Sequence, residues 1–283
     1  MYVNTNQMLK AAREEGYAIG AFNVENAEMV CAVLEAAEEL RAPVILQTTS
    51  STLKYLSPDY FGGMVRAAAE KVTVPVALHL DHGASFALAQ SCVEAGYTSI
   101  MIDGSALAFE NNISLSEEVC RMCAKKGIPV EAELGVVGGK EDDTKASAIK
   151  YTDFKQAVEF VKRTGIASLA VAVGTAHGFY KEAPQIQFEL IQKFRAGIEV
   201  PLVLHGASGL SDAVVSEAVR LGMAKVNFAT ELRVAYSQGV KDTIAAYPNA
   251  YDPKQYGTEG RSCVREIVKK KMLLCGCVNK ADR

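Results

Sequence analysis

Histidine is scarce in this sequence, and each histidine lies at or near the end of a short apolar run. The four are His79, His82, His177 and His205. Three imidazoles make a good Zn2+ site and leave a position open for water or substrate. We expect His82, His177 and His205 to form such a site, because they arrive from three separate apolar runs. Alternation along its run aims His79 into the interior below the rim, so we predict a packing or supporting role for it.

Asp81 precedes one of these expected ligands in the segment HLDHG at 79–83. Neighbours on a regular strand point to opposite faces, so Asp81 and His82 both reach one site only where the strand ends. Gly83 would permit that change of direction. A carboxylate beside a metal serves as a general acid or base, or else orients a ligand by a hydrogen bond.

Two further carboxylates, Glu131 and Glu133, lie on one side of the run VEAEL at 130–134. Inward carboxylates are costly unless they meet cations or donors, so we interpret them as a weak or alternate metal ligand and its support. The segment GGKEDD at 138–143 follows them. It is either a solvated turn or a lid that brings in Glu141 as a base.

Two segments near the end of the chain have the composition of anion sites. HGASG at 205–209 offers backbone N–H groups and a hydroxyl, and NFAT at 227–230 adds an amide and another hydroxyl. Both follow apolar runs and precede helical patterns, an arrangement that recurs in phosphate sites. The expected binding residues are Gly206, Ala207, Ser208, Asn227, Phe228, Ala229 and Thr230.

The elements that must position these residues are short apolar runs alternating with amphipathic stretches. The runs span residues 18–24, 43–49, 74–81, 99–103, 129–134, 168–174, 201–204 and 225–228. Helical patterns between them include 27–40, 59–71, 85–95, 111–126, 152–164 and 212–221. This order predicts an α/β protein, a (β/α)8 TIM barrel whose strands end at one active face. An open doubly wound sheet is the second candidate, but no G-x-G-x-x-G turn follows the first run.

Two segments depart from a minimal barrel. Residues 135–150 form a long polar stretch with glycines, which predicts a functional loop and a mobile lid. Residues 247–260 are rich in Pro, Gly, Asn and Tyr, and an amphipathic helix follows near 262–275. We expect this extra C-terminal helical segment to pack across the barrel or against a second subunit. The chain, 1–283, is expected to be a single domain.

Composition restricts the partners. The 30 Lys and Arg against 33 Asp and Glu give a net charge of −3, without the basic stripe of a nucleic-acid-binding protein. No apolar run approaches the roughly 18 residues that span a bilayer, and no signal peptide is visible, so we expect no membrane association. The seven scattered cysteines indicate free thiols, and together these features predict a cytoplasmic protein.

The motifs HLDH at 79–82, VEAELG at 130–135, GGKED at 138–142, GTAHG at 174–178 and LHGASG at 204–209 resemble the class II fructose/tagatose-bisphosphate aldolases over essentially the whole chain. The resemblance implies a catalytic Zn2+ on His82, His177 and His205. It implies that Asp81 handles the proton at the C4 oxygen and that Glu141 exchanges the proton at C3 of dihydroxyacetone phosphate. Gly178 and the two anion-binding segments would hold the triose phosphate, with Lys181 as a helper and a monovalent cation, Na+ or K+, nearby.

The same resemblance implies cleavage of a ketose 1,6-bisphosphate through a zinc-stabilised enediolate. Lys225 would offer a Schiff-base route, but three histidines favour the metal. Ala229 and the ending LCGC at 274–277 resemble the tagatose type more than the fructose type. Thr258 stands where many members carry an arginine for the second phosphate, with Lys254 or Arg261 as substitutes. A deoxy-keto-sugar-acid phosphate is therefore an alternative substrate.

The resemblance further implies a homodimer or homotetramer, and some tagatose-type enzymes need an accessory subunit. Two functions of other classes compete with this reading. A zinc hydrolase would use a metal-bound hydroxide but would not need two phosphate-type turns. A non-catalytic barrel subunit would have no reason to keep Asp81, Glu141 and three histidines together.

Overall fold

Eight parallel strands close into a barrel in the computed structural model, which describes residues 1–141, 144–146, 150–178, 180 and 184–282. Their order around the barrel is β1-β11-β10-β8-β5-β4-β3-β2. They are β1 (Ile19–Asn23), β2 (Val44–Thr49), β3 (Val76–Gly83), β4 (Ser99–Ile102), β5 (Val130–Leu134), β8 (Ser168–Val171), β10 (Leu202–Leu204) and β11 (Met223–Phe228). The predicted barrel is confirmed, and the closed order excludes the open sheet.

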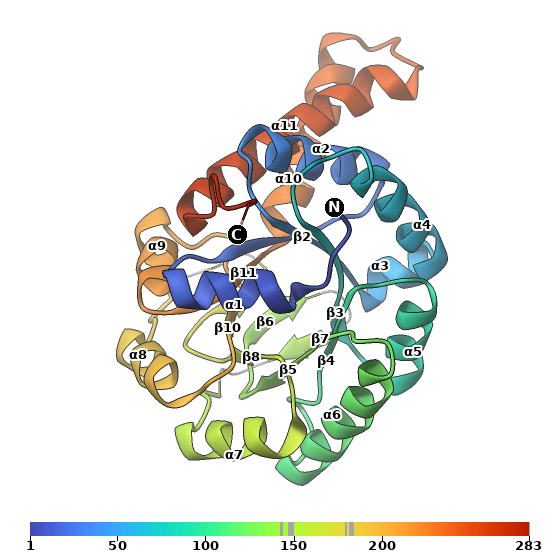
Figure 1. Cartoon of the computed structure of the whole chain (residues 1–283). Helices are drawn as coiled ribbons and strands as arrows, with labels where there is room; N and C mark the ends of the chain where they lie inside the picture. Colours follow the sequence, from blue (N-terminus) through green and yellow to red (C-terminus); the bar gives the residue numbers. More distant parts are fainter. Residues whose placement is uncertain (142–143, 147–149, 179, 181–183, 283) are drawn as a thin grey trace.

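Helices surround the strands in a ring, as Figure 1 shows. They are α2 (Ala27–Glu39), α4 (Pro58–Ala69), α5 (Phe86–Glu94), α6 (Phe109–Ala124), α7 (Phe154–Thr164), α8 (Phe188–Gly197), α9 (Asp212–Arg220) and α10 (Thr230–Ala246), with a short α3 (Ser50–Tyr55) after β2. The side chains of Asn26, Ser85 and Ser211 accept hydrogen bonds from backbone N–H groups at the starts of α2, α5 and α9. Such caps satisfy donors that have no partner inside the helix.

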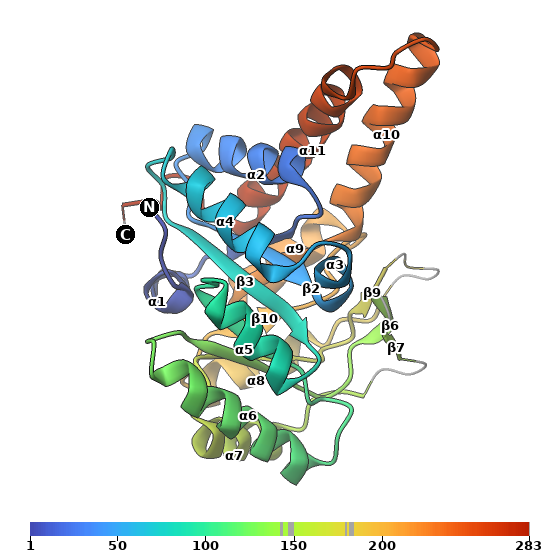
Figure 2. The ribbon, with the colours of Figure 1, turned by 90° about the vertical axis from the view of Figure 1, so that its right-hand side faces the viewer.

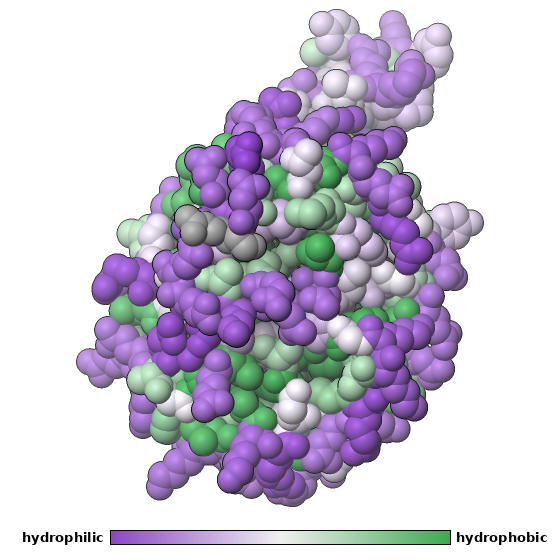
Figure 3. All heavy atoms as spheres, in the orientation of Figure 1, coloured by the Kyte–Doolittle hydropathy of each residue, from purple (hydrophilic) through white to green (hydrophobic). Residues whose placement is uncertain are grey.

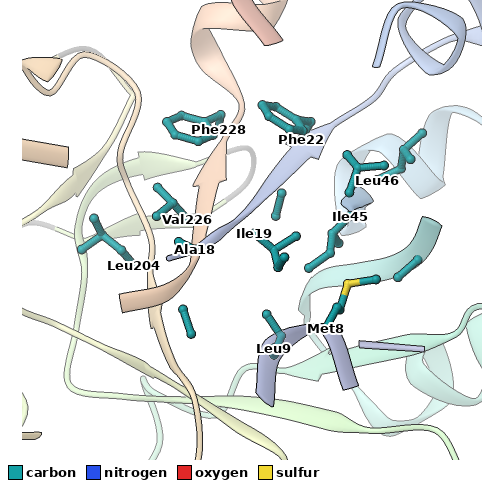
Figure 4. Packing of buried hydrophobic residues seen from close by; sticks show 14 of the residues in the cluster. Met8, Leu9, Ala18, Ile19, Phe22, Ile45, Leu46, Leu204, Val226 and Phe228 are labelled. Carbon is teal, nitrogen blue, oxygen red and sulfur yellow. The ribbon is translucent and has the colours of Figure 1, made fainter. Parts of the chain in front are cut away.

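Helix α1 (Thr5–Glu15) closes the end of the barrel at which the strands begin. Its buried Met8 and Leu9 point toward Ile19 and Ile45 in the core (Figure 4). Mostly polar side chains, with small apolar areas between them, cover the face that carries the two termini (Figure 3). None of the helices in the described ranges is long and apolar enough to cross a membrane.

A small second sheet lies at the opposite end, where the barrel strands finish (Figure 2). It contains β6 (Gly138–Glu141), β7 (Thr144–Ala146) and β9 (Ala176–His177), in the order β7-β6-β9. The segment 135–150, predicted as a long functional loop, contains β6 and β7, which form an antiparallel hairpin within it. The hairpin is tied to β9 by parallel pairing of Gly138 with Ala176 and Gly139 with His177.

The last helix, α11 (Pro253–Cys275), pairs with α10 in a hairpin that projects from the barrel (Figures 1 and 2). The helix predicted near 262–275 begins earlier than expected, at Pro253, and ends at Cys275. Gly260 and Gly239 lie where the two helices approach closely, since a Cβ at Gly260 would lie 2.8 Å from the ring of Tyr236 and a Cβ at Gly239 would lie 2.9 Å from the backbone of Glu259. The glycines therefore serve close packing of two helices. Helix α11 also packs against α2, which agrees with the predicted alternative in which this segment packs across the barrel.

Candidate metal centre and active site

Three histidines from different parts of the barrel meet at its C-terminal end. Nitrogen atoms of His82, His177 and His205 all lie within 4.8 Å of one another. His82 comes from the end of β3, His177 from β9, and His205 directly follows β10. The closest pair is His205 Nδ1 and His82 Nε2, at 2.8 Å. His79 takes no part, since its Nδ1 lies 2.8 Å from Ser99 Oγ inside the barrel.

The outer nitrogens of two of these rings are held by carboxylates. His82 Nδ1 lies 2.7 Å from Asp103 Oδ2, and His205 Nε2 lies 3.0 Å from Glu131 Oε1. A carboxylate on one ring nitrogen fixes the tautomer and directs the other nitrogen toward a metal. The donor set therefore fits Zn2+, with two oriented imidazoles and a third beside them.

The protonation states of His205 and Asp103 are also suited to binding a metal ion. Burial lowers the pKa of His205, and the hydrogen bond to Glu131 offsets this only in part, so its imidazole is neutral and able to donate a lone pair. Burial opposes ionisation of Asp103, but hydrogen bonds from His82 and Ser105 hold the pKa of its carboxyl well below its usual value. Asp103 ends the predicted run 99–103, and that position was its only sequence signal.

The backbone of His82 explains how Asp81 and His82, which are neighbours, both face the site. His82 has φ 47°, a left-handed conformation that costs a non-glycine residue on the order of 1–3 kcal/mol. The predicted change of direction at Gly83 was therefore wrong in position, since it occurs at His82. Gly83 is required for another reason, because a Cβ there would lie 2.5 Å from the carbonyl oxygen of Met101.

Asp81 is fully buried and is surrounded by side-chain amides. Asn23 Nδ2 and Gln47 Nε2 each donate to its Oδ2 at 3.0 Å, and Asn227 Nδ2 donates to its Oδ1 at 3.1 Å. Amide donors hold a carboxylate in place without neutralising its charge. Sequence reasoning missed Asn23 and Gln47, although a buried polar residue inside each of the first two apolar runs was the available signal.

Two buried oxygen atoms of the amides that hold Asp81 have no donor among the described residues. They are Gln47 Oε1 and Asn227 Oδ1, which lack a hydrogen-bond partner in the part of the chain that the structure describes. Unpaired buried acceptors are rare because each costs free energy. Their grouping here is suited to a ligand that brings its own hydroxyl donors.

Below the histidines, Lys225 forms a buried ion pair with Glu131. Its Nζ lies 3.1 Å and 2.9 Å from the two carboxylate oxygens and 3.4 Å from His79 Nε2. Burial opposes ionisation of Glu131, but the Lys225 ammonium holds the pKa of its carboxyl well below its usual value. Glu131 is thus the supporting member of the predicted carboxylate pair. Glu133 instead groups with His82 and Asp103 as potential metal ligands.

The turn after β10 is tied to its surroundings at three points. Tyr180 Oη donates to the carbonyl oxygen of Gly206 at 2.7 Å, and Ser208 Oγ accepts from the N–H of Ala229 at 3.1 Å. Glu231 Oε1 accepts from the N–H of Gly209 at 2.6 Å. Gly206 has φ 66°, and a Cβ there would lie 2.6 Å from the carbonyl oxygen of Ala176, so no other residue fits.

The N-terminus of α10 lies beside this turn. Its N-cap residue is Ala229, which has no side-chain oxygen to accept from the first N–H groups of the helix, and the N–H of Ala229 itself donates to Ser208 Oγ in the turn. Two further predicted residues have no described side chain. Lys181 lies outside the described residues, and only the backbone of Glu141 is described, at the end of β6.

The residues predicted to replace an arginine at a second phosphate lie on α11. Lys254 pairs with Asp252 at 2.8 Å, and Arg261 Nε donates to Glu35 at 3.0 Å. Thr258 donates to the carbonyl oxygen of Lys254. All three are thus engaged within the helical hairpin or with α2, and the structure does not bring them to the metal centre of the same chain.

Comparison with known proteins gives consistent matches over the whole chain. Residues 3–280 match the family described as fructose-bisphosphate aldolase class-II. The YdjI aldolase from Escherichia coli K12 is 41% identical, with a TM-score of 0.89 over 99% of this chain and 100% of that chain. A putative fructose-1,6-biphosphate aldolase from Coccidioides immitis is 28% identical, with a TM-score of 0.89 over 98% and 97%. The fructose-bisphosphate aldolase of Campylobacter jejuni is 25% identical, with a TM-score of 0.82 over 99% and 96%.

Proposed function

The chain belongs to the class II fructose-bisphosphate aldolase family, and on that premise we propose that it reversibly cleaves a ketose 1,6-bisphosphate into dihydroxyacetone phosphate and glyceraldehyde 3-phosphate. Its enzyme class is that of a ketose-bisphosphate aldolase, an aldehyde-lyase. The observation that carries the proposal is the convergence of three histidines next to a carboxylate held by three amides.

His82, His177 and His205 are the residues that would hold Zn2+. The metal would supply a Lewis acid to the oxygens of the ketose. Asp103 and Glu131 support this role by orienting two of the rings, at 2.7 Å and 3.0 Å. Lys225 is not needed for a Schiff base, because its ammonium is fully buried and paired with Glu131.

Asp81 is the proposed acid and base at the C4 oxygen of the sugar. In cleavage its carboxylate takes the C4 hydroxyl proton as the C3–C4 bond breaks, and in synthesis it returns that proton. The amides of Asn23, Gln47 and Asn227 fix the carboxylate, so little reorganisation is needed when the proton moves. The unpaired oxygens of Gln47 and Asn227 are suited to accept hydrogen bonds from other sugar hydroxyls.

Glu141 is the proposed base at C3 of dihydroxyacetone phosphate. Cleavage leaves an electron pair at C3, and Glu141 would deliver the proton that completes the triose phosphate. The support is a backbone relation, since β6 carries Glu141 two positions after Gly139, which pairs with the expected ligand His177. A lid formed by the β6–β7 hairpin would bring the base to the site after substrate binds.

The phosphate of the triose would bind between the 206–208 turn and the start of α10 at 227–230. The glycine turn and the N-terminus of α10 support this, because backbone N–H groups and the helix dipole attract anions. Gly178 and Lys181 complete the proposed set, with a monovalent cation beside the phosphate. Ala229 favours tagatose 1,6-bisphosphate, whereas the fructose-type relatives favour fructose 1,6-bisphosphate.

The active protein is proposed to be a homodimer or homotetramer. Large apolar side chains are exposed along the projecting α10–α11 hairpin, and a second copy of the chain would cover them. They are Val234, Ile244, Tyr247, Tyr251 and Leu273. Sedimentation velocity of the purified protein tests this, and a monomer at micromolar concentration would refute it.

The test of function is triose phosphate release from tagatose 1,6-bisphosphate and fructose 1,6-bisphosphate in parallel. Each is measured before chelation, after chelation and after zinc is restored. We expect zinc-dependent cleavage and a higher kcat/KM for the tagatose sugar. Cleavage of neither sugar by zinc-loaded protein would refute the bisphosphate assignment and direct attention to sugar-acid phosphates or an accessory subunit.

A further inference from the structure

Lys271, on the C-terminal helix α11, contacts a residue that holds the turn at 206–209. The Lys271 side chain is only 4% exposed, although lysine is rarely buried without a partner. Its Nζ lies 2.6 Å from Glu231 Oε2 and 5.2 Å from the centre of the Phe228 ring. Phe228 is the residue of β11 that follows Asn227, so Lys271 lies against the outer side of the second proposed phosphate segment.

Glu231 connects this lysine to the turn. Its Oε2 accepts from Lys271, and its Oε1 accepts from the N–H of Gly209 at 2.6 Å. The same turn is held from its other side by the hydrogen bond between the N–H of Ala229 and Ser208 Oγ. The path from Lys271 through Glu231 to Gly209 therefore joins α11, α10 and the turn after β10.

The opposite charges of Glu231 and Lys271 make their contact relevant to phosphate binding. Glu231 lies in the first turn of α10, where a carboxylate is favourable for the helix but repels a phosphate at the same N-terminus. The Lys271 ammonium offsets that charge at a short distance. Without it, an uncompensated carboxylate would remain directly bonded to the phosphate turn.

We propose that Lys271 is a positioning residue for phosphate binding. It neutralises Glu231 and holds its carboxylate against Gly209, so that the 206–208 turn keeps its shape without repelling the anion. This inference rests on the phosphate site of the proposed function. Lys271 itself does not touch substrate, since Glu231 stands between it and the turn.

The experiment measures the affinity of the zinc-loaded, full-length protein for inorganic phosphate by calorimetry. The variants are Lys271→Met, Glu231→Gln and the double variant Lys271→Met/Glu231→Gln. Lys270→Met is the matched control, because Lys270 is the adjacent residue and pairs with Asp212 at 3.0 Å on the surface. Zinc content and the melting temperature are measured for every variant.

We expect Lys271→Met to weaken phosphate binding roughly tenfold, because it removes a cation and exposes the anion to an unbalanced carboxylate. Glu231→Gln keeps an acceptor for Gly209 and should bind phosphate at least as tightly as the parent. The double variant, with neither charge, should return to within about threefold of the parent. Lys270→Met should not differ from the parent.

The outcomes distinguish a failure of the Lys271 role from a failure of the proposed phosphate site. If the parent protein does not bind phosphate, the proposed phosphate site fails. If the parent binds it and Lys271→Met binds equally well, the role of Lys271 fails. A double variant as weak as Lys271→Met would also overturn the inference, because it would show that the lysine acts through packing and not through its charge. Should Lys271→Met not fold, Lys271→Gln takes its place under the same expectation, because it removes the charge and keeps a hydrogen-bond donor for Glu231.

Discussion

Asp81 is the residue in which position and chemistry are most closely linked. In its proposed role of taking and returning a proton, this carboxylate gains from neighbours that fix it and do not protonate it. Asn23, Gln47 and Asn227 meet that requirement because each donates through an amide. They come from β1, β2 and β11, which are adjacent in the barrel. Three neighbouring strands therefore each contribute a side chain that holds Asp81.

Asp81→Asn should therefore retain zinc and lose turnover. An amide of the same size cannot accept the proton, and loss of a general acid–base group typically lowers kcat by about 10²–10⁴-fold. Steady-state cleavage and metal content are measured on the same samples. Asp59→Asn, at an exposed position on α4, is the control. Turnover within a few-fold of the parent would remove Asp81 from its role.

The buried pair of Lys225 and Glu131 supports a different prediction, on stability. Lys225→Met leaves a buried carboxylate without its cation, which typically costs about 3–5 kcal/mol. Lys225→Met/Glu131→Gln removes both charges and should recover most of that loss. Urea unfolding of the zinc-free protein measures this. A double variant no more stable than Lys225→Met would show that the pair matters for shape and not for charge.

Sequence reasoning identified the residues whose type alone signals chemistry, including the three histidines that lie together at the candidate metal centre. It did not find Asn23, Gln47 or Asp103. Asn and Gln occur widely on surfaces, so their types carry little information until their inward direction is known. Asp103 acts through contact with His82, 21 residues away, and no local pattern encodes such a contact.

At the scale of elements, the barrel strands were predictable because strands covered by helices are apolar along their whole length. The β6–β7 hairpin was not, since its residues are polar and its pairing with β9 depends on the folded barrel. The start of α11 was missed because Gly257 and Gly260 weaken a helix in isolation. Contact with α10 outweighs that local cost.

Tyr180 connects β9 to the turn after β10 through its hydroxyl group, and we expect stability and phosphate binding to depend on that group. Its hydroxyl donates to Gly206 and accepts from the N–H of Ala176 at 2.8 Å, and burial raises its pKa to about 12, so it stays protonated. Tyr180→Phe should cost on the order of 1–3 kcal/mol of stability and raise KM more than it lowers kcat. Tyr60→Phe, which changes an exposed ring, is the control for both measurements. An unchanged KM would show that this tie does not shape the phosphate turn.

At the scale of the whole molecule, the three histidines connect parts of the barrel that are far apart in sequence. A bound metal would stabilise the folded chain by roughly 4 kcal/mol at a free concentration a thousandfold above its Kd. We therefore expect chelation to lower the melting temperature and abolish cleavage, and zinc to restore both. His205→Ala should melt at the same temperature with or without zinc. A zinc-dependent melting temperature in that variant would contradict the ligand assignment.

The Lys225–Glu131 pair also implies an order of events when the chain folds. The two residues are 94 positions apart and lie on strands that do not pair with each other. Burying either charge alone is costly, so we expect both side chains to stay hydrated until β5 and β11 have joined the barrel. Long-range contacts of this kind form slowly. A half-built barrel would thus hold a wet, charged interior, and the last strands would close on it as that water leaves.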